Sequence, residues 1–261
     1  MRNLNKMKIA AISIATVDGL PKANYLRAFR LVEIALMDSP DIVLLPEAFA
    51  AGYCGIDLAR FAETRSSPSL RRFRDLSRAG HCMIVLGFLE KCARGIRNAV
   101  ILFDQGREIG IHYKRTLWPD DQRPYRDELS LITPGQDLEV FETRFGKCAV
   151  ITCYENMVEE NWSEAGPKVD FILSPYNCED DPSRHNQEKS RRYHVPSVWA
   201  NRTGTVWAGD RYLPNPGTAG VVDATGLLMA KSAPGVEEIV STELLIEVPQ
   251  DASFGSSGNK L

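Results

Sequence analysis

The sequence lacks several features that would define a functional class at once. There is no CxxC pair among the six cysteines and no HExxH motif among the four histidines, so zinc-ribbon, thioredoxin-like and zincin sites are excluded. No uncharged apolar run reaches the roughly 20 residues that cross a bilayer, which excludes an integral membrane protein. Basic residues are not in excess, since the formal net charge is -3, and a nucleic acid or an anionic membrane would require a basic surface. Chemistry on a small molecule is the class that remains.

The chain is long enough to bury a core by itself. With 261 residues and 44% hydrophobic content, residues 1–261 are expected to form a single domain. The start, "MRNLNKMKIAAISIATVDG", resembles a signal peptide, but its apolar run is short and lacks a small-x-small cleavage site, which favours a buried first strand. The irregularly spaced cysteines indicate reduced thiols and a cytoplasmic protein.

Apolar runs of strand length alternate with segments of helical period, which predicts an α/β fold. A short "DQG" turn between two runs predicts a hairpin, so the sheet should be mixed. The expected helices cover residues 23–39, 67–80 and 181–195. The expected strands cover residues 8–15, 41–47, 82–90, 97–106, 107–114, 138–146, 147–153, 169–175, 197–204, 217–226 and 227–232.

Three polar residues of different chemistry each end a predicted strand. Glu47 ends "DIVLLPE", Lys114 ends "REIGIHYK" and Cys153 ends "KCAVITC". Taken singly, each has an ordinary structural interpretation: a carboxylate at a helix start, a solvated cation and a small core residue. Because ligands bind beyond the carboxyl ends of strands in α/β sheets, the three side chains are expected to meet at one edge.

An acid, an ammonium and a thiol together make a nucleophilic site. A cysteine is mostly protonated at neutral pH, so it needs a base such as Glu47 or a neighbouring cation such as Lys114 to act as a nucleophile. The lysine can also stabilise the oxyanion of a tetrahedral intermediate. This combination predicts attack on a carbonyl or a nitrile carbon.

Four segments, in order, resemble the nitrilase superfamily, the carbon-nitrogen hydrolases with a Glu-Lys-Cys triad. They are "LLPEAFAAGY", "HYKRTLW", "GKCAVITCYEN" and "VWANRTG", and they span nearly the whole chain. The resemblance implies a four-layer α-β-β-α sandwich with two mixed β-sheets facing each other. It also implies a homodimer or a larger homo-oligomer and a reaction that requires no metal and no organic cofactor.

The resemblance also implies roles for individual residues. Glu47 would be the base, Cys153 the nucleophile, and Lys114 with the backbone N–H of Tyr154 the oxyanion site. Glu128, in "ELSLITPG", matches a second family glutamate that orients the lysine. The product would form through a thioester on the cysteine.

The substrate is less well defined. Tyr rather than Trp after the cysteine and the short chain favour an amidase over a nitrilase, and an N-carbamoyl amino acid or amine amidohydrolase stays open. The segment after the cysteine, "ENMVEENWSE", lacks the arginine and "FPE" of many relatives. By analogy, the pocket would be lined by Tyr53, Trp118, Tyr154 and Asn177. Loop arginines 123, 126 and 211 could bind a substrate carboxylate or simply pair with neighbouring aspartates.

Three other functional classes have less support in the sequence. A catalytically silent binding protein on the same fold would be expected to have lost one reactive group, and all are present. A zinc hydrolase would need clustered ligands, which the scattered histidines do not provide. A redox protein would need a partner thiol for Cys153, and the nearest along the strand, Cys148, should point to the opposite face.

Overall fold

The computed structural model describes residues 2–52, 58–93, 95–119, 128–207 and 210–249. The first half of the chain contains, in order, β1 (Arg2–Val17), α1 (Pro21–Leu36), β2 (Ile42–Leu44), the 3₁₀ turn η1 (Leu58–Arg60), α2 (Pro68–Ala79), β3 (Met83–Cys92), β4 (Gly95–Asp104), β5 (Arg107–Tyr113) and α3 (Glu128–Leu131). The second half contains β6 (Val140–Thr143), β7 (Gly146–Val150), η2 (Cys153–Met157), α4 (Glu159–Ala165), η3 (Gly166–Lys168), β8 (Phe171–Tyr176), α5 (Ser183–Tyr193), β9 (Ser197–Trp207), β10 (Tyr212–Pro216), β11 (Gly220–Val222), β12 (Leu228–Lys231) and β13 (Glu238–Pro249).

The long first strand joins the two halves of the molecule. The strand order is β5-β4-β3-β2-β1-β9-β8-β7-β6, with β10, β11, β12 and β13 attached outside this path. β1 pairs with β2 on one edge. β1 also pairs with β13, antiparallel, over Arg2–Ser13 and, through Ile14–Val17, with β9, in parallel. Both halves contain parallel and antiparallel pairs, so both are mixed.

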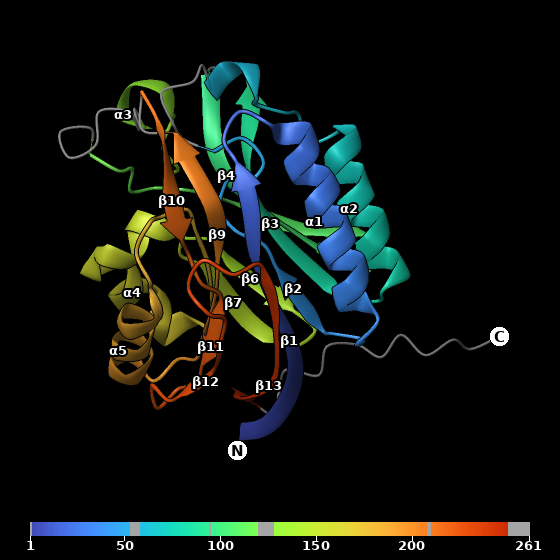
Figure 1. Cartoon of the computed structure of the whole chain (residues 1–261). Helices are drawn as coiled ribbons and strands as arrows, with labels where there is room; N and C mark the ends of the chain where they lie inside the picture. The colour runs from blue at the N-terminus through green and yellow to red at the C-terminus, as the bar shows by residue number, and fades with distance from the viewer. Residues whose placement is uncertain (1, 53–57, 94, 120–127, 208–209, 250–261) are drawn as a thin grey trace.

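Three apolar cores separate four layers. The largest core lies between the two halves of the sheet and combines side chains such as Ile9 and Leu44 with Val150 and Val198. A second core lies between the first half and helices α1 and α2. A third packs α4 and the end of α5 onto the second half, and Figure 1 shows α4 and α5 on the side opposite α1 and α2. The predicted α-β-β-α sandwich is therefore confirmed.

Local sequence explains why these elements form. Helix α1 has Pro21 at its first turn and buries Tyr25, Ala28 and Val32, which recur at helical spacing. Helix α2 also starts at a proline, after Ser67 accepts a hydrogen bond from the Leu70 N–H at 3.3 Å. Within the described ranges, no helix has the length and hydropathy needed to cross a bilayer.

The structure differs from the expectation in two respects. The two sheets are not separate, because the β1–β9 pairing links them into one hydrogen-bonded path. Strands β10 and β13 and the short helices α3 and α4 had not been predicted. For β13 the signal was present, since Val240, Leu244, Ile246 and Val248 alternate with exposed or half-buried residues and are buried.

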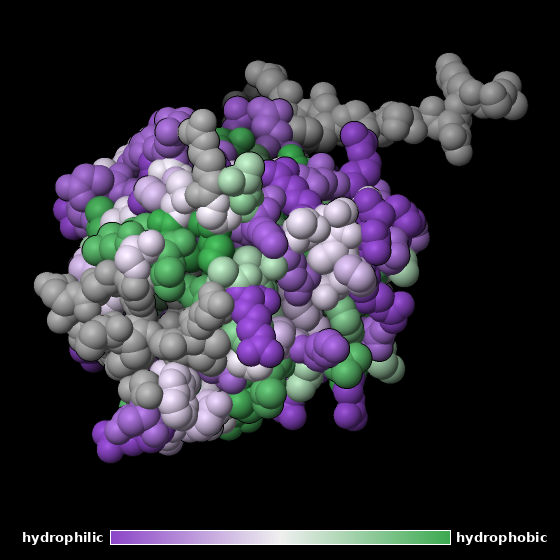
Figure 2. Space-filling view, turned by 90° about the horizontal axis from the view of Figure 1, so that it is seen from above, coloured by the Kyte–Doolittle hydropathy of each residue, from purple (hydrophilic) through white to green (hydrophobic). Residues whose placement is uncertain are grey.

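Strand directions decide where the site can form. β1, β2 and β3 run parallel, and β5 runs with them because it follows two antiparallel pairings. β7, β8 and β9 also run parallel to β1. The carboxyl ends of β2, β5 and β7 therefore point the same way, toward the upper end of Figure 1. Seen from that end, the surface carries a cluster of hydrophobic residues among hydrophilic ones (Figure 2).

Candidate active site

Glu47, Lys114 and Glu128 form a buried chain of charges. The Lys114 Nζ donates to Glu47 Oε1 at 2.9 Å and to Glu128 Oε1 and Oε2 at 2.8 and 3.0 Å. The three residues are at most 2% exposed. These side chains come from the segments after β2 and β5 and from α3, so the structure brings together three residues that the sequence had predicted from distant positions.

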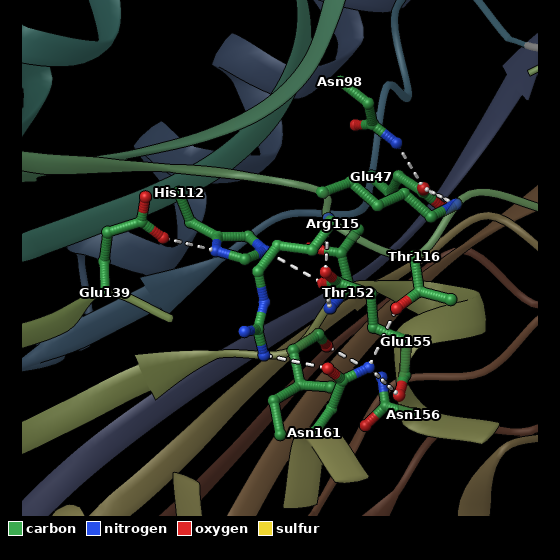
Figure 3. A network of polar contacts seen from close by, with 12 residues as sticks. Glu47, Asn98, His112, Arg115, Thr116, Glu139, Thr152, Glu155, Asn156 and Asn161 are labelled. Carbon is green, nitrogen blue, oxygen red and sulfur yellow. Dashed lines mark hydrogen bonds and ion pairs between the residues drawn. The ribbon is translucent and has the colours of Figure 1, made fainter. Parts of the chain in front are cut away.

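Strand β4 and the turn after β8 fix the Glu47 segment. Asn98 of β4 donates its Nδ2 to Glu47 Oε1 at 2.7 Å, and its carbonyl accepts the Lys114 N–H at 2.9 Å. The Glu47 N–H donates to the Tyr176 carbonyl at 3.2 Å, and the Asn177 side chain donates to the Glu47 carbonyl at 3.3 Å. Glu47 is thus held from both halves of the molecule, its carboxylate by Asn98 and its backbone by Tyr176 and Asn177 (Figure 3 shows the Asn98 contact).

A glycine lets the sheet approach this segment closely. A Cβ on Gly87 of β3 would lie 2.5 Å from Glu47 Cα and 2.7 Å from Ala48 N. Both contacts are with backbone atoms, which cannot rotate away as the end of a side chain can. Ala48 itself has a φ of 41°, in the left-handed region. The backbone next to Glu47 is therefore tightly constrained.

The loop after Lys114 is held by the second glutamate and by an aromatic contact. The Trp118 N–H donates to Glu128 Oε2 at 2.6 Å. The Trp118 ring packs edge-on against Tyr154, with the ring centroids 4.9 Å apart. Two of the predicted pocket residues are therefore in contact, and they connect the lysine loop to the residue after the cysteine.

Cys153 lies at the sharp turn where the chain leaves strand β7 and enters η2. It is the first residue of η2, is 7% exposed and has a φ of 46°. It packs with Tyr176, Trp199 and Val222, and Cys178 lies against the same cluster. A left-handed backbone at a residue other than glycine is costly and recurs at functional sites.

The charges influence one another strongly. Burial raises the pKa of Glu47, although Lys114 opposes this effect. Burial alone would lower the pKa of Lys114, but Glu128, Glu47 and Cys153 outweigh it and raise that pKa, so the ammonium stays charged. A hydrogen bond with Cys178, burial and the Glu47 carboxylate hold the pKa of Cys153 well above its ordinary value, while Lys114 acts in the opposite direction. Cys153 therefore lies within electrostatic reach of both Glu47 and Lys114.

The remaining predicted residues have different outcomes. Asn177 is 1% exposed and contacts the Glu47 backbone, as described above. Arg211 is exposed. Tyr53, Arg123 and Arg126 lie outside the described residues, and their roles stay predictions.

Several residues around the site had not been predicted. Asn98 was detectable, because it is an uncharged polar residue within the apolar strand "NAVILF". Gly87 also interrupts an apolar strand, which is a signal for close backbone approach. Cys178 carried no local signal, since its proximity to Cys153 depends on the tertiary fold. Cys148 lies in the core between the sheets and not with Cys153.

The fold and the buried polar cluster indicate the class of protein to which the chain belongs. A solved structure with the same fold, Saccharomyces cerevisiae Nit3, described as a member of branch 10 of the nitrilase superfamily, matches with a TM-score of 0.78 and 21% identity over 91% of this chain and 89% of that one. The chain belongs to the carbon-nitrogen hydrolase family, whose model matches residues 8–250. The family resemblance of the motifs is therefore confirmed.

Two relatives cover nearly the full length. A probable nitrilase of Schizosaccharomyces pombe is 26% identical over 90% of this chain and 88% of its own. The omega-amidase NIT3 of Saccharomyces cerevisiae is 25% identical over 93% of this chain and 88% of its own. Both are proteins to which this chain is similar.

Proposed function

We propose that the protein is an amidase that converts a small amide to an acid and ammonia or an amine through a thioester on Cys153. The observation that carries the proposal is the buried Glu47–Lys114–Glu128 chain of contacts, which lies within electrostatic reach of this thiol. The omega-amidase among the relatives supports the choice of an amide.

The chemistry follows from the positions of the groups. Glu47 removes the proton of Cys153, and the sulfur forms a bond to the substrate carbon. The tetrahedral oxyanion is stabilised by Lys114 and by the Tyr154 N–H. Protonated Glu47 then gives its proton to the leaving nitrogen, and the carbon–nitrogen bond breaks. Water, deprotonated by Glu47, hydrolyses the thioester and restores the thiol.

Glu128 acts on the lysine. Its two oxygens both accept from Lys114 Nζ, and Trp118 fixes one of them. We propose that this contact orients the ammonium toward the oxyanion and helps it to stay charged. Tyr53, Trp118, Tyr154 and Asn177 remain the proposed pocket residues.

Assembly and location are part of the proposal. By family resemblance, residues 1–261 would act as one domain in a homodimer or a larger homo-oligomer. The five described cysteines are free thiols, which supports a reducing compartment such as the cytoplasm.

Ammonia release from small primary amides, N-carbamoyl compounds and nitriles tests the proposal. Amides should be turned over, and mass spectrometry of the intact protein should detect an acyl adduct on Cys153. Cys153→Ala should lower turnover by more than about 1,000-fold and remove the adduct while the fold is kept. Ammonia from nitriles alone would make the protein a nitrilase, turnover of N-carbamoyl compounds alone would make it a carbamoyl amidohydrolase, and no turnover and no adduct would favour a binding protein.

A further inference from the structure

A third buried carboxylate lies beside the proposed catalytic residues and makes no hydrogen bond or ion pair with their side chains in the described structure. Glu155 is 1% exposed. Its Oε1 accepts the N–H of Arg115 at 2.6 Å, and its Oε2 accepts the N–H of Thr152 at 2.8 Å. Arg115 directly follows Lys114, and Thr152 directly precedes Cys153. One side chain therefore joins the two segments that carry the lysine and the cysteine.

A histidine holds this carboxylate in place. His112, on β5 two residues before Lys114, lies 2.9 Å through Nε2 from Glu155 Oε2 and 3.0 Å through Nδ1 from Glu139 Oε2 (Figure 3). A neutral imidazole has one N–H, whereas both ring nitrogens here face carboxylates. Only the imidazolium form donates to both, so His112 supplies the positive charge that a buried Glu155 requires.

Asn161 connects the same two segments a second time. Asn161 of α4 donates to the Glu155 carbonyl at 2.9 Å and to the Thr116 hydroxyl at 3.3 Å. The Arg115 guanidinium donates to Asn161 Oδ1 at 2.8 Å. These contacts repeat the same connection, from the lysine loop to the cysteine turn, by a second route (Figure 3).

We propose that Glu155, held by His112, is a positioning residue for the hydrolase reaction: it fixes the distance between the Lys114 segment and the left-handed turn at Cys153. This inference rests on the proposed function. The turn at Cys153 is strained, and a strained backbone persists only where its surroundings hold it. Glu155 supplies such a hold, because it accepts the N–H next to the nucleophile.

Glu155→Gln is the main test. An amide has two oxygen lone-pair sites on one atom and two donors on the other, so in either orientation its NH₂ faces an N–H donor. We expect kcat for a turned-over primary amide to fall about 10- to 100-fold, as for a small misplacement of reacting groups. KM should change much less, because ground-state contacts with substrate are kept. Glu164→Gln is the matched control: Glu164 contacts the outer guanidinium of Arg115 at 3.0 Å and the Lys168 ammonium at 3.4 Å, and its loss should leave kcat unchanged.

Two histidine variants separate positioning from general stability. The amide nitrogen of Gln reaches the place of the histidine Nε2 and can donate to Glu155, whereas that of Asn reaches the place of Nδ1 and can donate only to Glu139. His112→Gln should therefore retain more of kcat than His112→Asn, and this order should persist at temperatures where both are fully folded by circular dichroism. Equal kcat values in both variants and in the wild type would overturn the proposal.

The pH dependence of stability and of kcat independently tests the role of the His112 charge. Burial alone would lower the pKa of His112, but Glu155 and Glu139 outweigh it and raise the pKa from 6.5 to about 9. Stability from the imidazolium is fully present below pH 6.5 and is lost as the pH rises through about 9. These two carboxylates are the charged groups that contact the ring among the described residues. The thermal midpoint and kcat of the wild type should fall across this range, and His112→Gln should lack this fall.

Covalent labelling distinguishes a failure of the positioning role from a failure of the proposed function. The probe is iodoacetamide, and its adduct on Cys153 is counted in the intact protein. If the wild type turns over amides but Glu155→Gln matches it in kcat and labelling rate, the positioning role is wrong and the hydrolase proposal stands. If the wild type neither turns over amides nor forms an acyl adduct, the proposed function fails and the positioning role fails with it.

Discussion

The two sides of the site are fixed in different ways. On the lysine side, three buried charged groups and Asn98 are joined side chain to side chain by hydrogen bonds of 2.7 to 3.0 Å. On the cysteine side, the thiol lies on a strained turn, and the described contacts that hold the turn are made largely with its backbone. Side-chain replacements should therefore disturb stability on the lysine side and reactivity on the cysteine side.

The sharpest contrast should come from Lys114→Met and Cys153→Ala. The first leaves Glu47 and Glu128 buried without their cation, and breaking a buried pair in this way costs about 3–5 kcal/mol. The second removes one sulfur atom and should cost about 1 kcal/mol. Urea unfolding measures both, while both should abolish turnover. Equal losses of stability would contradict the comparison.

Gly87→Ala tests whether the position of Glu47 is set by the backbone. The added Cβ meets the Glu47 backbone at 2.5 Å, so the segment must shift, and a shift near 1 Å costs about 100-fold in kcat. Gly80→Ala is the control, because the atoms nearest to its Cβ all belong to the flexible Leu36 side chain, the closest at 2.4 Å. Normal kinetics in Gly87→Ala would mean that the segment adapts without loss.

Cys178→Ala should give the smallest effect and the opposite sign. The contact with Cys178 is the largest of the influences that raise the pKa of Cys153. Its removal should lower that pKa and speed alkylation by iodoacetamide a few-fold at neutral pH, since the thiolate reacts. Cys92→Ala, with a thiol outside this cluster, should leave the rate unchanged. An unchanged alkylation rate in Cys178→Ala would mean that Cys178 does not control the reactivity of Cys153.

Much of the site was predictable because it depends on strand ends. Glu47, Lys114 and Cys153 each follow an apolar run, and parallel strands bring such ends to one edge. The four layers came from family resemblance, because alternation alone is common to many α/β folds. His112 and Glu155 were not predicted as partners, since their contact depends on how β5 packs against the turn after β7. A histidine in an apolar strand was a visible signal, but its charge follows only from seeing carboxylates on both sides.

The pairing of β1 with β13 has a consequence for biosynthesis. Arg2–Ser13 pairs along its length with Glu238–Pro249, so during synthesis this part of β1 is made long before the strand that pairs with it. Until then this edge of β1 offers unpaired N–H and C=O groups on which another chain can add a strand. A nascent chain that ends before position 238 keeps that edge open permanently, and prematurely terminated products should therefore be the aggregating species in a cell that makes this protein.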